Sequence, residues 1–319
     1  MDFNTFKKLS KDYKTVQVYK RIMADLLTPI STYMRLAKES EYSFILESAE
    51  QGEGYGRYSF IGRNPHQIIK SDNNLTSIYE NGSWGSSPDS FLSVLRKVQQ
   101  KYHAPKLSGI PHFTGGLVGF MGYESIVWVE EIPVYKKDEL QCPDALFMLF
   151  NEIIAFDHFK NQIILFSNVQ IEEGIDIKKA YKEANLRIDE MGENLHTDID
   201  YQTPARLKQS ERQSNFTREK FKTVIKKAKE HINAGDIFQL VLSQRFKAKL
   251  TKKPLEIYKK LRLTNPSPFM YFFNFPDFQI IGASPEILVR LRDNKITVRP
   301  IAGTRPRGIN IKQDIFFEK

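Results

Sequence analysis

Short apolar runs separated by turn residues dominate the first half of this 319-residue chain. Runs of this length, with glycine, asparagine or proline between them, are typical of β-strands joined by tight turns. The clearest hairpin signal is Asn81-Gly82, because both residues suit the left-handed positions of a two-residue turn. We expect a helix at 88–102, where the apolar residues fall on one helical face. We expect strands at 42–50, 58–62, 67–70, 75–80, 113–123, 145–156 and 162–168.

No segment of the sequence has the character of a membrane span. The most apolar stretch, Leu146–Phe156, is interrupted by polar residues and is shorter than the roughly 18 apolar residues that a spanning helix needs. The N-terminus has lysines but no apolar core behind them, so it does not resemble a secretory signal. The single cysteine, Cys142, cannot form an internal disulfide. We therefore expect a folded cytoplasmic protein with no membrane partner.

The net charge of +9 is concentrated in one part of the chain. The segment Arg206–Arg262 holds 17 basic and 5 acidic residues. Within it, Thr217 can cap a helix that Gly235 ends, and an apolar stripe runs along the residues between them. Most of the lysines lie off that stripe, and aromatic residues of the kind that stack on bases do not alternate with them. The basic block is thus interpreted as a solvated helix surface, and no nucleic-acid partner is expected.

Two common kinds of site are not supported by the spacing of their residues. Gly52, Gly54 and Gly56 follow a strand, but the spacing differs from the dinucleotide-binding pattern and no helix follows. A tight hairpin is the better interpretation. The histidines show no spacing typical of zinc ligands.

The segment Asp236–Phe246 predicts a strongly apolar strand. Alternation places Gln239 on one face with Val241, Ser243 and Arg245. Polar side chains in a buried strand cost free energy unless they are paired, so such a row lines either a functional site or a polar network.

Two further segments carry candidate chemistry. Glu286 follows a Ser-Pro bend at the start of the apolar run 287–289, so we expect it to be partly buried. Burial raises the pKa of a glutamate, which suits a general acid; a salt bridge is the structural alternative. The loop 299–308 is rich in glycine and arginine, and such loops bind carboxylates.

Several motifs together resemble the chorismate-utilising enzymes, and within them the large-subunit family of anthranilate synthase. The resemblance runs from about residue 10 to 308. Isochorismate-forming members carry a lysine where Gln239 stands, and aminodeoxychorismate synthases carry one in place of Ala302, so both positions favour anthranilate synthase. The motifs that carry the resemblance are Ile45–Glu50, Gly115–Phe120, Gly235–Phe246, Asn265–Phe272, Gly282–Glu286 and Pro300–Gly308.

The resemblance implies a reaction and residues that serve it. Chorismate would bind with Mg²⁺, ammonia from a glutamine amidotransferase subunit would add to the ring, and water and pyruvate would leave to give anthranilate. Glu286 would protonate the departing hydroxyl, Gln239 would belong to the catalytic site, and Gly303 and Thr304 would hold chorismate. L-Tryptophan would inhibit from a second site. Its residues would be Glu47, Ser48, Pro268, Phe269 and Met270.

The resemblance also implies the architecture. We expect an α+β fold with a large, mostly antiparallel β-sandwich and helices outside. The expected regions are a tryptophan-sensing half at 1–195, a linker at 196–215, an incomplete chorismate-binding region at 216–308 and an atypical tail at 309–319. The family's Mg²⁺ ligands are expected beyond this chain, which favours a C-terminally truncated or frameshifted form without activity. The alternatives are a non-catalytic module that binds tryptophan or the amidotransferase, and an aminodeoxychorismate synthase large subunit.

Overall fold

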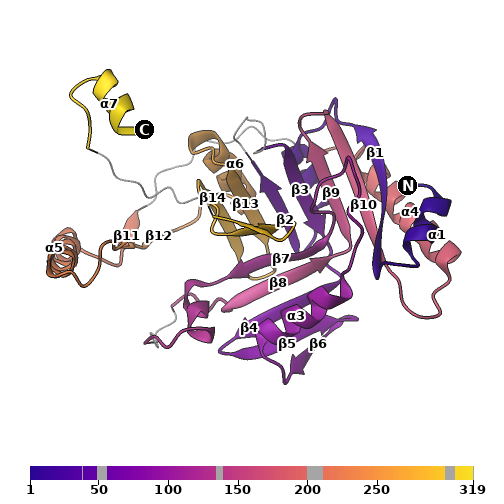
Figure 1. The fold of residues 1–319 in the computed structure, drawn as a ribbon, viewed down its shortest axis with the longest axis horizontal. Helices are drawn as coiled ribbons and strands as arrows, with labels where there is room; N and C mark the ends of the chain where they lie inside the picture. The colour runs from indigo at the N-terminus through magenta and orange to yellow at the C-terminus, as the bar shows by residue number, and fades with distance from the viewer. Residues whose placement is uncertain (38, 49–55, 134–138, 200–210, 299–305, 319) are drawn as a thin grey trace. The chain divides into compact units, whose positions relative to one another are not determined.

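The computed structural model describes residues 1–37, 39–48, 56–133, 139–199, 211–298 and 306–318 (Figure 1). By their internal contacts the residues form two compact units, one comprising Met1–Asp200 with Leu261–Lys319 and the other Tyr201–Lys260. Each unit is described by itself below. The regions predicted from the sequence are defined by function and not by internal contacts, so that division stays a prediction.

The first unit contains a large antiparallel sheet of seven strands (Figure 1). Its strands come from both ends of the sequence, since β13 (Phe269–Asn274) pairs with β2 (Ser43–Glu47). The strand order is β1-β10-β9-β3-β2-β13-β14. The remaining strands are β1 (Thr15–Met23), β3 (Tyr58–Arg63), β9 (Glu152–Asp157), β10 (Gln162–Gln170) and β14 (Gln279–Ser284).

A second antiparallel sheet has five strands in the order β6-β5-β4-β8-β7. The predicted hairpin is confirmed between β5 and β6, where Asn81 and Gly82 both have positive φ, 53° and 84°. The strand predicted at 145–156 is divided in two, because the chain crosses between the sheets at Asn151. The strands are β4 (Gln67–Asp72), β5 (Leu75–Glu80), β6 (Ser83–Ser87), β7 (Gly116–Met121) and β8 (Ala145–Phe150).

The hydrophobic core lies between the two sheets. Phe44 from the larger sheet packs edge-on against Phe150 from the smaller one, with ring centroids 4.9 Å apart. Because successive strand residues face opposite sides, Ile68 joins this core while Ile69 packs under α3 (Phe91–Lys101), as expected for the helix predicted there. The predicted sandwich is confirmed.

Helices cover the outer face of the larger sheet. Helix α4 (Ile177–Asn194) lies along β10 and β1, and α2 (Pro29–Leu36) packs on β2 and β3 (Figure 1). Helix α1 (Phe3–Leu9) packs on α4. The predicted α+β class with helices outside is therefore confirmed. Within the described ranges, no helix is both long and apolar enough to span a membrane.

The remaining elements of the first unit are short. They comprise a 3₁₀ helix η1 (Tyr123–Trp128), the hairpin strands β15 (Arg290–Arg292) and β16 (Lys295–Thr297), and α7 (Ile311–Glu318). Helix α6 (Pro254–Thr264) is continuous across the boundary between the units, which falls between Lys260 and Leu261.

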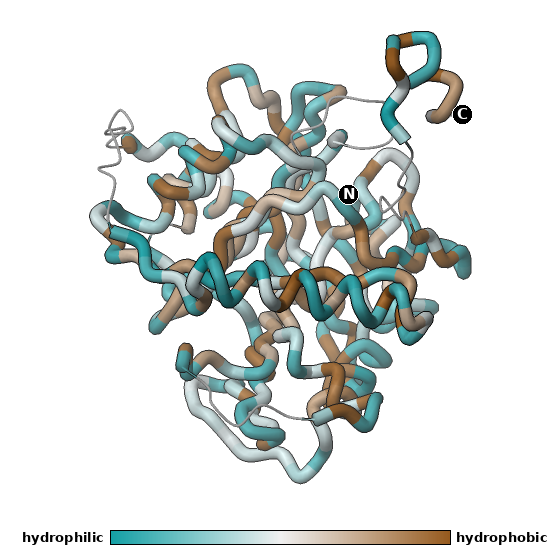
Figure 2. Tube along the Cα trace, turned by 90° about the vertical axis from the view of Figure 1, so that its left-hand side faces the viewer, coloured by the Kyte–Doolittle hydropathy of each residue, from teal (hydrophilic) through white to brown (hydrophobic). Residues whose placement is uncertain are grey.

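The second unit is built around the predicted helix, α5 (Arg218–Ala234). The Thr217 side chain accepts a hydrogen bond from the Lys220 N–H, and Gly235 ends the helix with φ +81°, as predicted. Figure 2 shows hydrophilic and hydrophobic residues alternating along this helix, which is drawn across the middle of the view. No α5 side chain is buried. The lysine-rich face is therefore solvated, as interpreted from the sequence.

The prediction of a strand at 236–246 is wrong. Only β12 (Phe246–Ala248) forms a strand there, and it pairs with β11 (Arg212–Ser214). Phe238 is 95% exposed and Val241 83% exposed. A strand needs a neighbouring strand for its backbone hydrogen bonds, and no described strand pairs with 236–244.

Candidate functional site

Two segments more than two hundred residues apart in sequence meet at the pairing of β2 with β13. Glu47 lies opposite Met270 in the register of this pair, and Leu46 lies opposite Tyr271. Ser48 follows β2 directly, while Pro268 and Phe269 lead into β13. The antiparallel register therefore places both halves of the predicted tryptophan site at one end of the strand pair.

All five of these residues line one pocket of about 850 Å³ in the first unit. Its wall has apolar side chains, among them Phe60, Ile110 and Phe113, which pack beside polar and charged ones. Phe60 and Phe113 meet at an interplanar angle of 87°. Apart from its tyrosines, the charged and titratable side chains of the pocket are Glu47, Arg57, Lys106, His112, Arg290, Arg292 and Asp293. A pocket with an apolar wall and charges of both signs suits a zwitterionic ligand that carries an apolar group.

Glu47 is the most buried charged group of the pocket, with a side chain only 4% exposed. Its Oε1 lies 3.1 Å from Nη2 of Arg262, which is on the last turn of α6 and is 40% exposed. A buried carboxylate of this kind needs a nearby positive charge. Glu47 is therefore suited to recognise the ammonium group of a ligand in the pocket.

In the pocket wall, Arg57 forms a two-pronged ion pair with Asp157. Its Nε and Nη2 donate to the Asp157 carboxylate at 3.0 and 2.7 Å, and its guanidinium lies over the ring of Tyr58. Burial works to raise the pKa of Asp157, but these bonds and the Lys160 N–H outweigh it, so the pKa lies below its ordinary value. Beside it, burial lowers the pKa of His158, assisted by the charge of Arg262.

Replacing Arg57 by glutamine is expected to destabilise the fold by about 2 kcal/mol near neutral pH, less than for a fully buried pair because Arg57 is 40% exposed. The low pKa of Asp157 stabilises the fold above the pKa of an unfolded aspartate. That contribution is lost as the pH falls through the lower folded value. The difference in the free energy of unfolding between the Arg57→Gln variant and the parent should therefore be smaller at about pH 3 than near neutral pH. Urea unfolding at both pH values measures this difference, and Arg96→Gln, at an exposed position, is the control. An equal loss at both pH values would contradict this account.

The predicted catalytic residues are placed differently from expectation. Glu286 is exposed rather than partly buried, and the strand after it begins only at Arg290. The Ser284 hydroxyl bonds to the Glu286 backbone N–H and C=O at 3.3 and 3.0 Å, which fixes the Ser-Pro bend. Leu288 beyond it is 89% exposed, since no described strand pairs with 287–289. The prediction of a partly buried glutamate is thus wrong for this structure.

The other predicted catalytic and substrate residues are of two kinds. Gln239 lies exposed in the irregular segment of the second unit, and not on the polar face of a strand as predicted. Gly303 and Thr304 lie outside the described residues. No group of three or more His, Cys, Asp or Glu side chains suited to hold a metal ion occurs in the described part of the chain.

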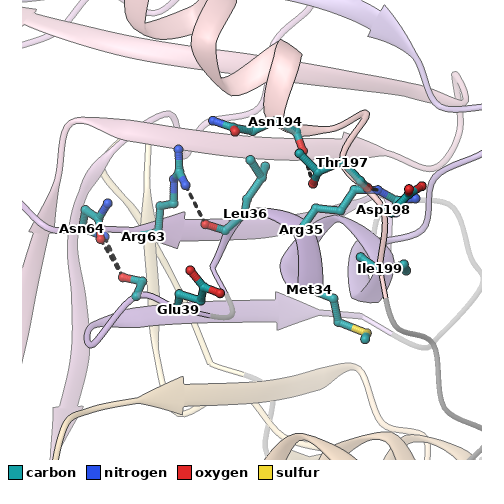
Figure 3. Close-up of a pocket in the computed structure, with 11 residues that line it drawn as sticks. Met34, Arg35, Leu36, Glu39, Arg63, Asn64, Asn194, Thr197, Asp198 and Ile199 are labelled. Carbon is teal, nitrogen blue, oxygen red and sulfur yellow. Dashed lines mark hydrogen bonds between the residues drawn. The ribbon is translucent and has the colours of Figure 1, made fainter.

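A second pocket, of about 450 Å³, lies where α2 and α4 end (Figure 3). Arg63 donates to the carbonyl of Leu36 at 2.8 Å, and Arg35 donates to that of Thr197 at 2.8 Å. Arginine side chains commonly satisfy the free carbonyls at helix C-termini. We therefore interpret this pocket as structural, and none of the predicted site residues lines it.

Several groups of the first pocket are not predicted from the sequence, notably Arg57, Lys106 and His112. Arg57 follows the glycine-rich segment, whose Gly52 and Gly54 lie outside the described residues, and the other two stand in the irregular segment before β7. No local pattern marks these positions, because only the packing of the larger sheet brings them to the pocket.

Comparison with known proteins defines the class. A family model described as chorismate binding enzyme matches residues 41–319. The sandwich fold agrees with it, and the chain belongs to the chorismate-binding enzyme family.

Within this family the chain is similar to curated proteins named anthranilate synthase component 1. The chain is 37% identical over 328 residues to anthranilate synthase component 1 of Acetivibrio thermocellus, which covers 98% of this chain and 64% of that protein. It is 38% identical over 327 residues to the component 1 protein of Cereibacter sphaeroides, covering 99% of this chain and 65% of that protein. The chain thus spans somewhat less than two thirds of the length of these relatives.

The chain is also similar to solved structures of this fold. The structure of anthranilate synthase component I from Streptococcus pneumoniae TIGR4 is similar with a TM-score of 0.61 and 32% identity, covering 87% of this chain and 60% of that one. MenF, the isochorismate synthase from Escherichia coli, has a TM-score of 0.50 at 11% identity, covering 98% of this chain and 61% of that one; this likeness concerns the fold alone.

Proposed function

We propose that this chain is part of the large subunit of an anthranilate synthase, and that it carries the tryptophan effector site of that subunit. The reaction converts chorismate and ammonia into anthranilate, pyruvate and water. The observation that supports the effector site most directly is the pairing of β2 with β13, which gathers Glu47, Ser48, Pro268, Phe269 and Met270 around one pocket. The sequence similarity to component 1 proteins supports the reaction.

The pocket has a group suited to each part of tryptophan. The carboxylate of Glu47 would accept hydrogen bonds from the ammonium group of tryptophan. A basic side chain such as Arg57 would bind the carboxylate of tryptophan. The indole ring would pack among Phe60, Phe113 and Met270, and its apolar surface would be buried there. Tryptophan bound there would act as a feedback inhibitor of the first step in its own synthesis.

For the reaction, we assign roles from the family resemblance. Glu286 would protonate the hydroxyl that leaves the ring, Gln239 would belong to the catalytic site, and Gly303 and Thr304 would hold chorismate. Mg²⁺ would act as a Lewis acid on the bound substrate. A glutamine amidotransferase subunit would supply ammonia, and the protein would act in the cytoplasm.

Calorimetry and product analysis test the proposal. We expect the chain to bind L-tryptophan with a measurable heat at millimolar ligand or below. Incubation of a full-length version with chorismate, ammonium and Mg²⁺ then identifies the reaction, since anthranilate supports this proposal and 4-amino-4-deoxychorismate indicates an aminodeoxychorismate synthase. A second candidate is a non-catalytic tryptophan-binding module. It is favoured by the described pocket, which is complete within the first unit while Glu286 is exposed. Tryptophan binding without either product would support it.

A further inference from the structure

The two members of the Glu47–Arg262 ion pair differ in their freedom to move. Glu47 is the last residue of β2, its backbone is held opposite Met270, and its side chain is 4% exposed. Arg262 reaches it from the last turn of α6 with a side chain that is 40% exposed. The carboxylate is therefore fixed in the pocket wall, whereas the guanidinium can turn into water on its flexible stem.

A ligand with an ammonium group would add a second cation beside the same carboxylate. Two like charges close together in a site of low dielectric repel each other strongly. Glu47 cannot follow one of them, and Arg262 is the cation already in partial contact with water, so its departure costs less desolvation. From this geometry, and resting on the tryptophan site proposed above, we infer that the ligand's ammonium group competes with Arg262 for Glu47. Filling of the pocket would thereby release Arg262.

The release would change more than the pocket. Arg262 belongs to α6, and the chain leaves this helix through Asn265 and Ser267 into β13, which itself lines the pocket. When an amino acid binds, its ammonium group would replace Arg262 beside Glu47, and the ion pair that links β2 to α6 would be lost. Arg262 would act as a positioning residue that reports whether the pocket is occupied.

The experiment compares two ligands on the parent chain, Arg262→Gln and the conservative Arg262→Lys. L-Tryptophan carries the ammonium group, and indole-3-propionate has the same ring and carboxylate without it. Calorimetry is carried out at about pH 8, well above the pKa of an ordinary glutamate. We expect Arg262→Gln to bind tryptophan about tenfold more tightly than the parent, since the internal competitor is gone. Arg262→Lys should bind like the parent, and indole-3-propionate should bind all three equally.

Unchanged or weaker tryptophan binding by Arg262→Gln would overturn the inference, as would an equal gain for both ligands. A parent chain that binds no tryptophan would instead overturn the effector site itself. If Arg262→Gln does not fold, the parent chain still gives an answer by NMR of the arginine side chain. The Arg262 Nε–H signal should shift on addition of tryptophan and not of indole-3-propionate. A shift with both ligands or with neither would contradict the exchange.

Discussion

Replacing Gly119 by alanine is expected to destabilise the first unit by at least about 3 kcal/mol. Gly119 lies in β7 opposite Phe147 of β8. A Cβ atom at this position would lie 1.9 Å from the carbonyl oxygen of Leu146 and 2.7 Å from the Cα of Phe147. Both are backbone atoms, so no side chain can turn aside. The strand pair would have to separate and would take Val118, which is 6% exposed, out of the core between the sheets.

Urea unfolding of Gly119→Ala and Gly85→Ala measures this effect. Gly85 also lies in a strand, β6, but a Cβ there would come no closer than 4.0 Å to the carbonyl oxygen of Ile78. Both variants gain the same methyl group and lose the same backbone freedom, so their difference isolates the close approach of β7 to β8. We expect Gly85→Ala to change stability by less than about 1 kcal/mol. Equal stability of the two variants would contradict the account.

The features that the sequence predicted correctly are local ones. The start and end of α5 follow from Thr217 and Gly235, whose caps need only neighbouring backbone groups. The β5–β6 hairpin follows from Asn81-Gly82 for the same reason. The glycine motif around Gly119 was visible in the sequence, but the reason for it was not, because the atoms that exclude a Cβ belong to another strand.

The features that were mispredicted depend on distant partners. The apolar alternation at 236–246 suits a strand, yet strand formation requires a neighbour that the described chain does not offer. Glu286 is exposed for the same reason, since the apolar run after it pairs with no strand among the described residues. The pocket depends on the register of β2 against β13, which no local pattern contains. The family resemblance could name Glu47 and Met270 together, but it could not indicate that Arg262 pairs with Glu47.

Replacing Ser48 by phenylalanine is expected to weaken tryptophan binding by at least about 100-fold. Ser48 follows Glu47 directly at the pocket wall and is only partly exposed. A phenyl ring on this residue would occupy the space between the carboxylate and the apolar wall, where the ligand is proposed to lie. The loss should exceed that of a deleted contact, because the ring excludes the ligand instead of binding it less well. Calorimetric titration with L-tryptophan measures the change.

Two control variants separate this effect from general damage to the fold. Ser83→Phe places the same ring on an exposed position of β6 and should leave the affinity for tryptophan unchanged. Ser48→Ala removes the hydroxyl without filling the pocket and should cost less than about tenfold, the worth of one hydrogen bond. The melting temperature of Ser48→Phe without ligand should stay close to that of the parent, because a partly exposed position can direct a ring toward solvent space in the pocket. If Ser48→Phe keeps its melting temperature and still binds tryptophan like the parent, the effector site lies elsewhere, and the ion pair of Glu47 with Arg262 has only a structural role.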